Sequence, residues 1–137
     1  LYYIYHRASH YFSWLWASHV VHHSSEEYNL STALRQPAND VIVPSALLSS
    51  TAMAFIFPPE LAVLHGRLSL LFQFWIHTQL VPPLPLFELL FNSPSLHRIH
   101  HARNLRALGK NYGSLLSIWD RLGGTFEPEL AIDEELY

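Results

Sequence analysis

The sequence predicts an all-α fold, namely an integral membrane helical bundle that carries a cytoplasmic cap of histidine-bearing helices. Three observations support this prediction. Half of the 137 residues are apolar and 14% are charged, which is a low charge content for a soluble domain. Two apolar stretches have about the length of a membrane span, and histidines recur at helical spacing outside them.

The composition excludes several functional classes. The formal net charge is -3 and the sequence has no basic stripe, so no nucleic-acid partner is expected. Cysteine is absent, which excludes a disulfide framework, a thiolate metal site and a cysteine nucleophile within this chain. Any metal that the chain binds must therefore be held by nitrogen or oxygen.

The first 23 residues are rich in aromatic side chains and contain no proline or glycine, so we expect one helix or two helices joined by a break. His10 and His19 are nine residues apart, which is about 180° around a continuous helix. They could not share a site on one straight helix. We therefore predict a break between about Trp14 and Ser18, followed by a short helix that begins at Ser24 or Ser25 and ends before Pro37.

The middle of the chain predicts a membrane hairpin over about residues 41–81. Residues 41–57 carry no charge, Pro58 and Pro59 break the run, and residues 61–81 form a second apolar stretch. Basic residues flank the histidine groups and are absent from the turn at 58–60, so the positive-inside rule places the histidines on the cytoplasmic side. A last amphipathic helix is expected over residues 112–122, before two glycines.

Ten histidines are present, and eight of them fall into three short motifs. Residues at i, i+3 and i+4 lie on one face of a helix, so each motif can direct its imidazoles toward one point. Eight neutral imidazoles exceed the needs of one ion, which predicts two metals, and imidazole suits iron, zinc, copper and nickel. The motifs are HRASH (His6, His10), HVVHH (His19, His22, His23) and HRIHH (His97, His100, His101).

These motifs match the H-x3-H, H-x2-HH, H-x2-HH pattern of the fatty acid hydroxylase and sterol desaturase superfamily, which consists of integral membrane non-haem di-iron enzymes. Four further stretches resemble its alkylglycerol monooxygenase branch, and the resemblance covers almost the whole chain. They read HHSSEEYNLSTALRQ, FQFWIHTQL, NSPSLHRIHHARN and KNYGSLLSIWDRLGGTFEPE. One local departure is Leu96, which stands where relatives often have an extra histidine before the third motif.

The resemblance implies a partial fatty acid hydroxylase-type domain over residues 1–137, with upstream membrane helices missing. It implies two iron ions, O2 as co-substrate and hydroxylation of a lipid C–H bond. In the alkylglycerol branch the product is a cleaved ether lipid and the reductant is tetrahydrobiopterin; elsewhere a redox protein donates the electrons. The expected location is the endoplasmic reticulum membrane in a eukaryote or the inner membrane in a bacterium.

The resemblance also adds His77 to the ligands, because family members carry a further histidine on the helix before the last motif. The expected metal ligands are His6, His10, His19, His22, His23, His77, His97, His100 and His101. A metal-bound imidazole usually donates its other N–H to a neighbouring acceptor. Candidates for this supporting role are Gln73, Asn111 and Asp120, together with Glu26 or Glu27. His65 matches no motif and is expected to be structural.

Three alternatives remain open from the sequence. The same motifs would serve a sterol desaturase or a fatty acid or carotenoid hydroxylase. A histidine-rich zinc-binding membrane protein would have no O2-dependent turnover. A pseudoenzyme fragment would lack activity because upstream helices are missing.

Overall fold

The computed structural model describes residues 1–38, 55–132 and 136, and these residues confirm the all-α prediction. They contain no β-strand, only an isolated bridge between Phe91 and Leu116. The helices, in chain order, are α1 (Tyr2–Tyr11), α2 (Ser13–His23), η1 (Thr32–Leu34), α4 (Pro59–Ile76), η3 (Phe87–Leu89), α5 (Pro94–His101), α6 (Ile118–Gly123) and η4 (Glu129–Ala131), where η marks a 3-10 helix.

A break divides the first helical segment, but it lies earlier than predicted. Phe12 adopts an extended conformation, with φ -93° and ψ 121°, and so separates α1 from α2. The prediction of a break at 14–18 was wrong in position because the segment contains no proline or glycine that would fix the place. The break nevertheless brings His10 and His19 together, with ring centroids 4.9 Å apart.

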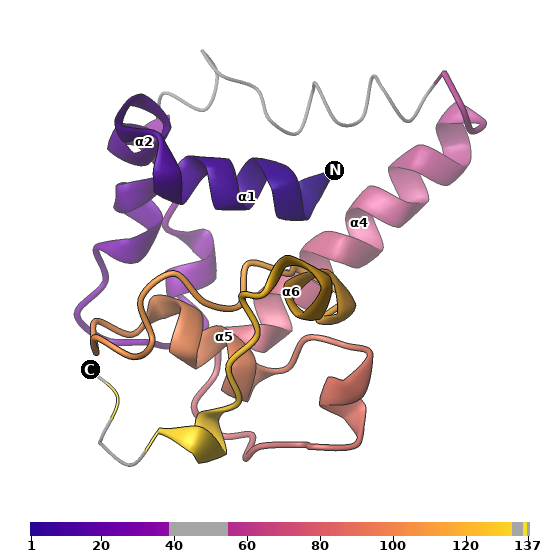
Figure 1. The fold of residues 1–137 in the computed structure, drawn as a ribbon. Helices are drawn as coiled ribbons and strands as arrows, with labels where there is room; N and C mark the ends of the chain where they lie inside the picture. The colour runs from indigo at the N-terminus through magenta and orange to yellow at the C-terminus, as the bar shows by residue number, and fades with distance from the viewer. Residues whose placement is uncertain (39–54, 133–135, 137) are drawn as a thin grey trace.

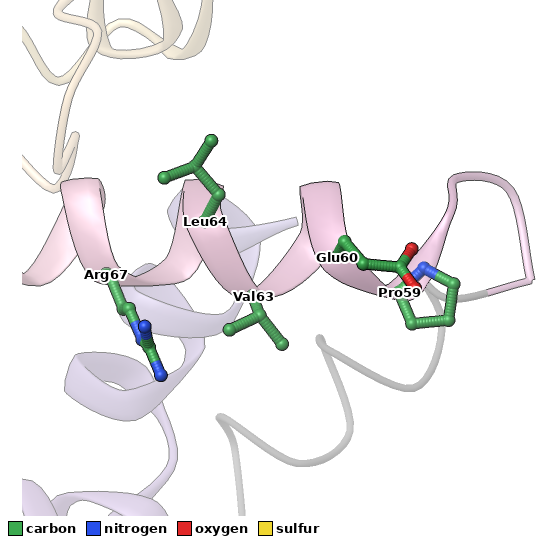
Figure 2. Close-up of a pocket in the computed structure, with 5 residues that line it drawn as sticks. All are labelled: Pro59, Glu60, Val63, Leu64 and Arg67. Atoms are coloured by element: carbon green, nitrogen blue, oxygen red, sulfur yellow. The ribbon is translucent and has the colours of Figure 1, made fainter.

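Helix α4 projects away from the rest of the described chain, and only its C-terminal end approaches α5 (Figure 1). Pro59 occupies the first turn and Glu60 adds a negative charge there, both of which favour a helix start. Leu64, Leu68 and Leu71 are exposed on this helix. Figure 2 shows a shallow hollow at its N-terminal half, lined by Pro59, Glu60, Val63, Leu64 and Arg67 and by no predicted metal ligand.

The predicted membrane bundle is not confirmed. Among the residues that the structure describes, no helix combines the length and the apolar character needed to cross a membrane. Most of the first half of the predicted 41–81 hairpin, residues 41–54, lies outside the described residues. Its second half corresponds to α4 and the turn after it.

Helix α5 carries the third histidine motif and has a strongly defined start. The Ser93 hydroxyl accepts a hydrogen bond from the Leu96 N–H at 3.1 Å, and Pro94 occupies the first helical turn. Ser93 also donates to the buried Glu88 carboxylate at 2.6 Å. The orientation of α5 is therefore fixed before its first histidine.

Two predicted helices are shorter in the structure than expected. After Ser24 only the 3-10 turn η1 forms, because Thr32 bonds through its side chain to the backbone of Glu27 and Asn29. The helix predicted over 112–122 is reduced to α6. The Asp120 carboxylate binds backbone N–H groups at the start of that stretch and holds it in a loop.

Buried polar side chains outnumber buried apolar ones in the described part of the chain. The apolar core there is small and consists of Ile99, Ala102 and Ala107, with Ile132 packed against it. The interior is therefore organised mainly around the histidines and their hydrogen-bond partners.

Candidate metal centre

All nine predicted ligands converge into two groups, within each of which the ligand nitrogens lie within 4.8 Å of one another. His65 belongs to neither group and is exposed on α4. The five-histidine group consists of His6, His10, His19, His23 and His100. The four-histidine group consists of His22, His77, His97 and His101.

The motifs do not each converge on one point, as the spacing alone suggested. The histidines at i and i+4 stay together, while the histidine at i+3 joins the other group. His22 thus belongs to a different group from His19 and His23, and His100 belongs to a different group from His97 and His101. Helices α2 and α5 therefore each contribute to both groups and link them.

The two groups are adjacent. The rings of His23 and His101, one from each group, stack with centroids 4.2 Å apart and an interplanar angle of 25°. His22 likewise lies beside His23, with centroids 5.3 Å apart. The arrangement fits two neighbouring metal ions better than two independent sites.

Several imidazoles donate their outer N–H to a backbone carbonyl. A carbonyl can only accept, so each such bond places the proton on Nδ1 and leaves the lone pair of Nε2 facing the group. This is the orientation that a metal ligand needs. The pairs are His6 with Tyr112 at 2.8 Å, His22 with Arg35 at 3.3 Å, His77 with Gln73 at 2.6 Å and His100 with Lys110 at 2.9 Å.

The histidine nitrogens that face the interior of the groups contact one another or have no hydrogen-bond partner. The Nε2 atoms of His22 and His77 are 3.2 Å apart, and both histidines already carry their proton on Nδ1. Two lone pairs therefore face each other, and a cation between them would relieve their repulsion. Buried nitrogens of four further histidines have no hydrogen-bond partner: His10 Nε2, His97 Nδ1, His100 Nε2 and His101 Nε2.

Protonation of the buried imidazoles, which would relieve the repulsion between facing lone pairs, is unfavourable. Burial, reinforced by neighbouring histidines, lowers the pKa of His10 to about 4 and of His19 to about 3. Burial also lowers the pKa of His22, although its bond to the Arg35 carbonyl opposes the shift. The imidazoles are neutral at neutral pH, so their nitrogens are available to a metal and the residues of the chain fit one.

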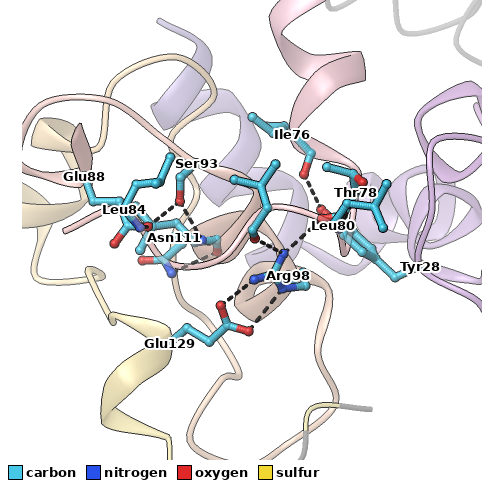
Figure 3. A network of polar contacts seen from close by, with 12 residues as sticks. Tyr28, Ile76, Thr78, Leu80, Leu84, Glu88, Ser93, Arg98, Asn111 and Glu129 are labelled. Carbon is cyan, nitrogen blue, oxygen red and sulfur yellow. Dashed lines mark hydrogen bonds and ion pairs between the residues drawn. The ribbon is translucent and has the colours of Figure 1, made fainter. Parts of the chain in front are cut away.

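Polar contacts outside the groups fix the elements that carry the four-histidine group. Arg98 donates to both oxygens of Glu129, at 3.1 and 2.6 Å, and its Nη1 donates to the carbonyls of Thr78 and Val81 (Figure 3). It thereby ties the turn after His77 to α5 and to η4. On the other side of that turn, Tyr28 donates to the Ile76 carbonyl at 2.8 Å and stacks on His77.

The predicted supporting residues do not contact the imidazoles with their side chains in the way expected. The Gln73 side chain donates to Ser69, and it is the Gln73 carbonyl that accepts from His77. Asp120 binds backbone N–H groups of the loop that supplies acceptors for His6 and His100. Asn111 lies in that loop and donates to the carbonyls of Leu96 and Glu127. The backbone carbonyl of Glu27 accepts hydrogen bonds from the hydroxyls of Ser25 and Thr32.

The acceptors that the sequence did not reveal are the carbonyls of Arg35, Lys110 and Tyr112. Every residue has a carbonyl, so no side-chain pattern marks these positions. They become visible only when the fold brings the loops against the helices.

Comparisons with known proteins agree with this site. The fatty acid hydroxylase family model matches residues 1–125. The chain is 50% identical to an alkylglycerol monooxygenase from Danio rerio and 45% identical to one from Homo sapiens, over 93% of this chain and 28% of each relative. It is 30% identical to the ornithine lipid hydroxylase OlsE of Rhizobium tropici, over 90% of this chain and 38% of that protein.

The chain thus spans little more than a quarter of the alkylglycerol monooxygenases that it matches. No solved structure matches it significantly. The family match includes all three histidine motifs and His77, and it confirms the superfamily resemblance noted in the sequence. The chain belongs to the fatty acid hydroxylase family.

Proposed function

We propose that this chain forms the metal-binding core of a membrane monooxygenase that uses two irons and O2 to hydroxylate a lipid. The observation that carries the proposal is the convergence of nine histidines into two adjacent groups. A purely nitrogen donor set suits iron, although zinc, copper and nickel also accept imidazole. The family membership and the lipid-acting relatives favour iron over the others.

The proposed reaction is the cleavage of an alkylglycerol ether. Bound iron would supply the activation of O2 for attack on an unactivated C–H bond. One oxygen atom enters the C–H bond beside the ether oxygen and the other leaves as water, with two electrons and two protons from a reductant. The resulting hemiacetal loses its C–O bond to give a fatty aldehyde and a glycerol derivative. Tetrahydrobiopterin is the proposed reductant, with a redox protein as the alternative.

In this proposal the residues of the chain position the metals and do not transfer protons. The nine histidines hold the irons, and backbone carbonyls keep the Nε2 lone pairs of at least four of them directed inward. Burial of the imidazoles keeps water from the reactive centre. The exposed leucines of α4 provide an apolar surface on the element that leads to His77.

We further propose that the full protein is embedded in a membrane and that the histidine groups face the cytoplasm. The uncharged run at 41–57 and the basic residues near the histidine motifs support this orientation. Single cysteines can report it in a full-length protein in which any cysteines outside this chain have been replaced. In sealed vesicles of known orientation, a membrane-impermeant thiol reagent should label Arg103→Cys from the cytoplasmic side and Glu60→Cys from the other side. Labelling of both from one side would contradict the hairpin.

The activity is tested with the full-length protein, purified and loaded anaerobically with iron. We expect O2-dependent release of fatty aldehyde from an alkylglycerol when tetrahydrobiopterin is supplied, and none from protein stripped by a chelator. A sterol and a fatty acyl lipid serve as competing substrates. Turnover of either of these alone would contradict ether cleavage. Bound zinc without O2 consumption would contradict the oxygenase proposal altogether.

A further inference from the structure

One short loop supplies the hydrogen-bond acceptors for two ligands of the five-histidine group. His100 Nδ1 donates to the Lys110 carbonyl at 2.9 Å, and His6 Nδ1 donates to the Tyr112 carbonyl at 2.8 Å. These histidines come from α5 and α1, yet their ring centroids are 4.4 Å apart. Residues 110–112 therefore connect two helices that are far apart in the sequence.

Asn111 gives this loop its shape. Its backbone has φ 53°, in the left-handed region, where asparagine is tolerated better than most residues other than glycine. Its side chain donates to the carbonyls of Leu96 and Glu127, at 3.0 and 2.8 Å, and accepts from the Glu127 N–H at 2.9 Å. Asn111 thus uses all of its polar atoms to hold the loop between α5 and the C-terminal segment, and it is 2% exposed.

Asp120 holds the other end of the loop. Its carboxylate accepts from the N–H groups of Tyr112 and Gly113, at 2.6 and 2.7 Å, and from the Thr125 hydroxyl at 2.8 Å. The contact is tight, because a Cβ atom at Gly113 would lie 2.6 Å from Asp120 Oδ2. One peptide group makes both contacts: its N–H, on Gly113, donates to Asp120, and its carbonyl, on Tyr112, accepts from His6.

We propose that residues 110–112 form a positioning loop for the five-histidine group, and that Asn111 and Asp120 are its positioning residues. Fixing the two carbonyls fixes the ring rotation and tautomer of His6 and His100, and so directs two Nε2 lone pairs at one metal. This inference rests on the proposed metal centre. In the four-histidine group, His22 and His77 donate to Arg35 and Gln73 instead of to the loop.

The test uses the full-length protein with Asp120→Asn. The amide oxygen of this variant can accept from only one of the two N–H groups, and its NH2 group faces the other N–H, donor against donor. Loss of such a supporting contact typically weakens metal binding about 10- to 100-fold. We expect this loss at one of the two metals only. Anaerobic iron titration measures the affinities, and Mössbauer spectra of the iron-loaded protein should show one altered iron signal beside one unchanged signal.

A second variant keeps the test independent of global folding. Asn111→Gly retains the left-handed backbone but removes all the side-chain bonds, so a loss of metal in this variant is due to those bonds. The matched control is Ser117→Ala, which removes one buried hydrogen bond, to the Glu88 carbonyl, without touching the loop. We expect this control to lower stability while leaving both iron affinities and both signals unchanged.

The outcomes separate the two proposals. The positioning loop is contradicted if Asp120→Asn and Asn111→Gly bind both irons with wild-type affinity and wild-type spectra, or if both sites weaken equally. A wild-type protein that binds no iron would instead contradict the proposed function. A selective loss at one site, absent from Ser117→Ala, supports the loop.

Discussion

Replacing His77 by alanine removes one of the four nitrogens of the four-histidine group and leaves the five-histidine group complete. Binding of a metal by a four-ligand site contributes about 10–16 kcal/mol in zinc-finger peptides, so one ligand of four is worth about 3 kcal/mol. Because 1.4 kcal/mol is about a factor of ten, the affinity of that site should fall about 100-fold.

The assay is anaerobic iron titration of full-length His77→Ala, with bound iron counted after removal of weakly held metal. We expect one iron per chain where the wild type holds two, together with loss of O2-dependent turnover. The matched control is His65→Ala, an exposed histidine on the same helix that belongs to neither group. It should bind two irons. Retention of both irons by His77→Ala, with unchanged affinity, would refute the four-histidine site as described.

Three further predictions concern stability. Ser93→Ala removes the N-cap of α5 and should lower the unfolding free energy by about 1 kcal/mol, or more because the Glu88 carboxylate loses one of its donors, as measured by denaturant titration. Glu129→Gln removes a charged partner of Arg98 and should cost about 1–2 kcal/mol in the same assay; an unchanged midpoint would contradict the role of this ion pair. The metal-free protein should lose stability as the pH falls below about 6.5 and on through about 4, because histidines of the unfolded chain take up protons that buried ones such as His10 and His19 do not. An acid transition that is absent over this range would contradict the burial of neutral imidazoles.

The convergence of the histidines could be predicted from the sequence, because the helical spacing within the three motifs indicates it for eight of them and the family resemblance adds His77. The nine candidate histidines are the nine that the fold brings together. Their division between the two groups was not predictable. It depends on how α2 and α5 are rotated about their axes, and that rotation is set by packing and by the cap at Ser93.

The residues that support the ligands were harder to predict, because the acceptors are backbone carbonyls. Asp120 and Asn111 were chosen as partners for imidazoles, but Asp120 binds the loop that carries two of the acceptors and Asn111 is part of that loop. The break between the first two helices was likewise predicted too late in the sequence, because only the local backbone geometry of Phe12 marks it. The sequence gives the chemistry of each side chain directly, whereas the direction of a backbone carbonyl depends on the tertiary fold.

We propose that nine histidines hold two metals in adjacent sites. The most direct measurement is the stoichiometry and spectroscopy of iron bound to the full-length protein under anaerobic conditions. We expect two irons per chain, with two distinct Mössbauer signals for a five-histidine and a four-histidine environment, if the proposed centre is right. One iron per chain, or two irons in identical environments, would contradict it.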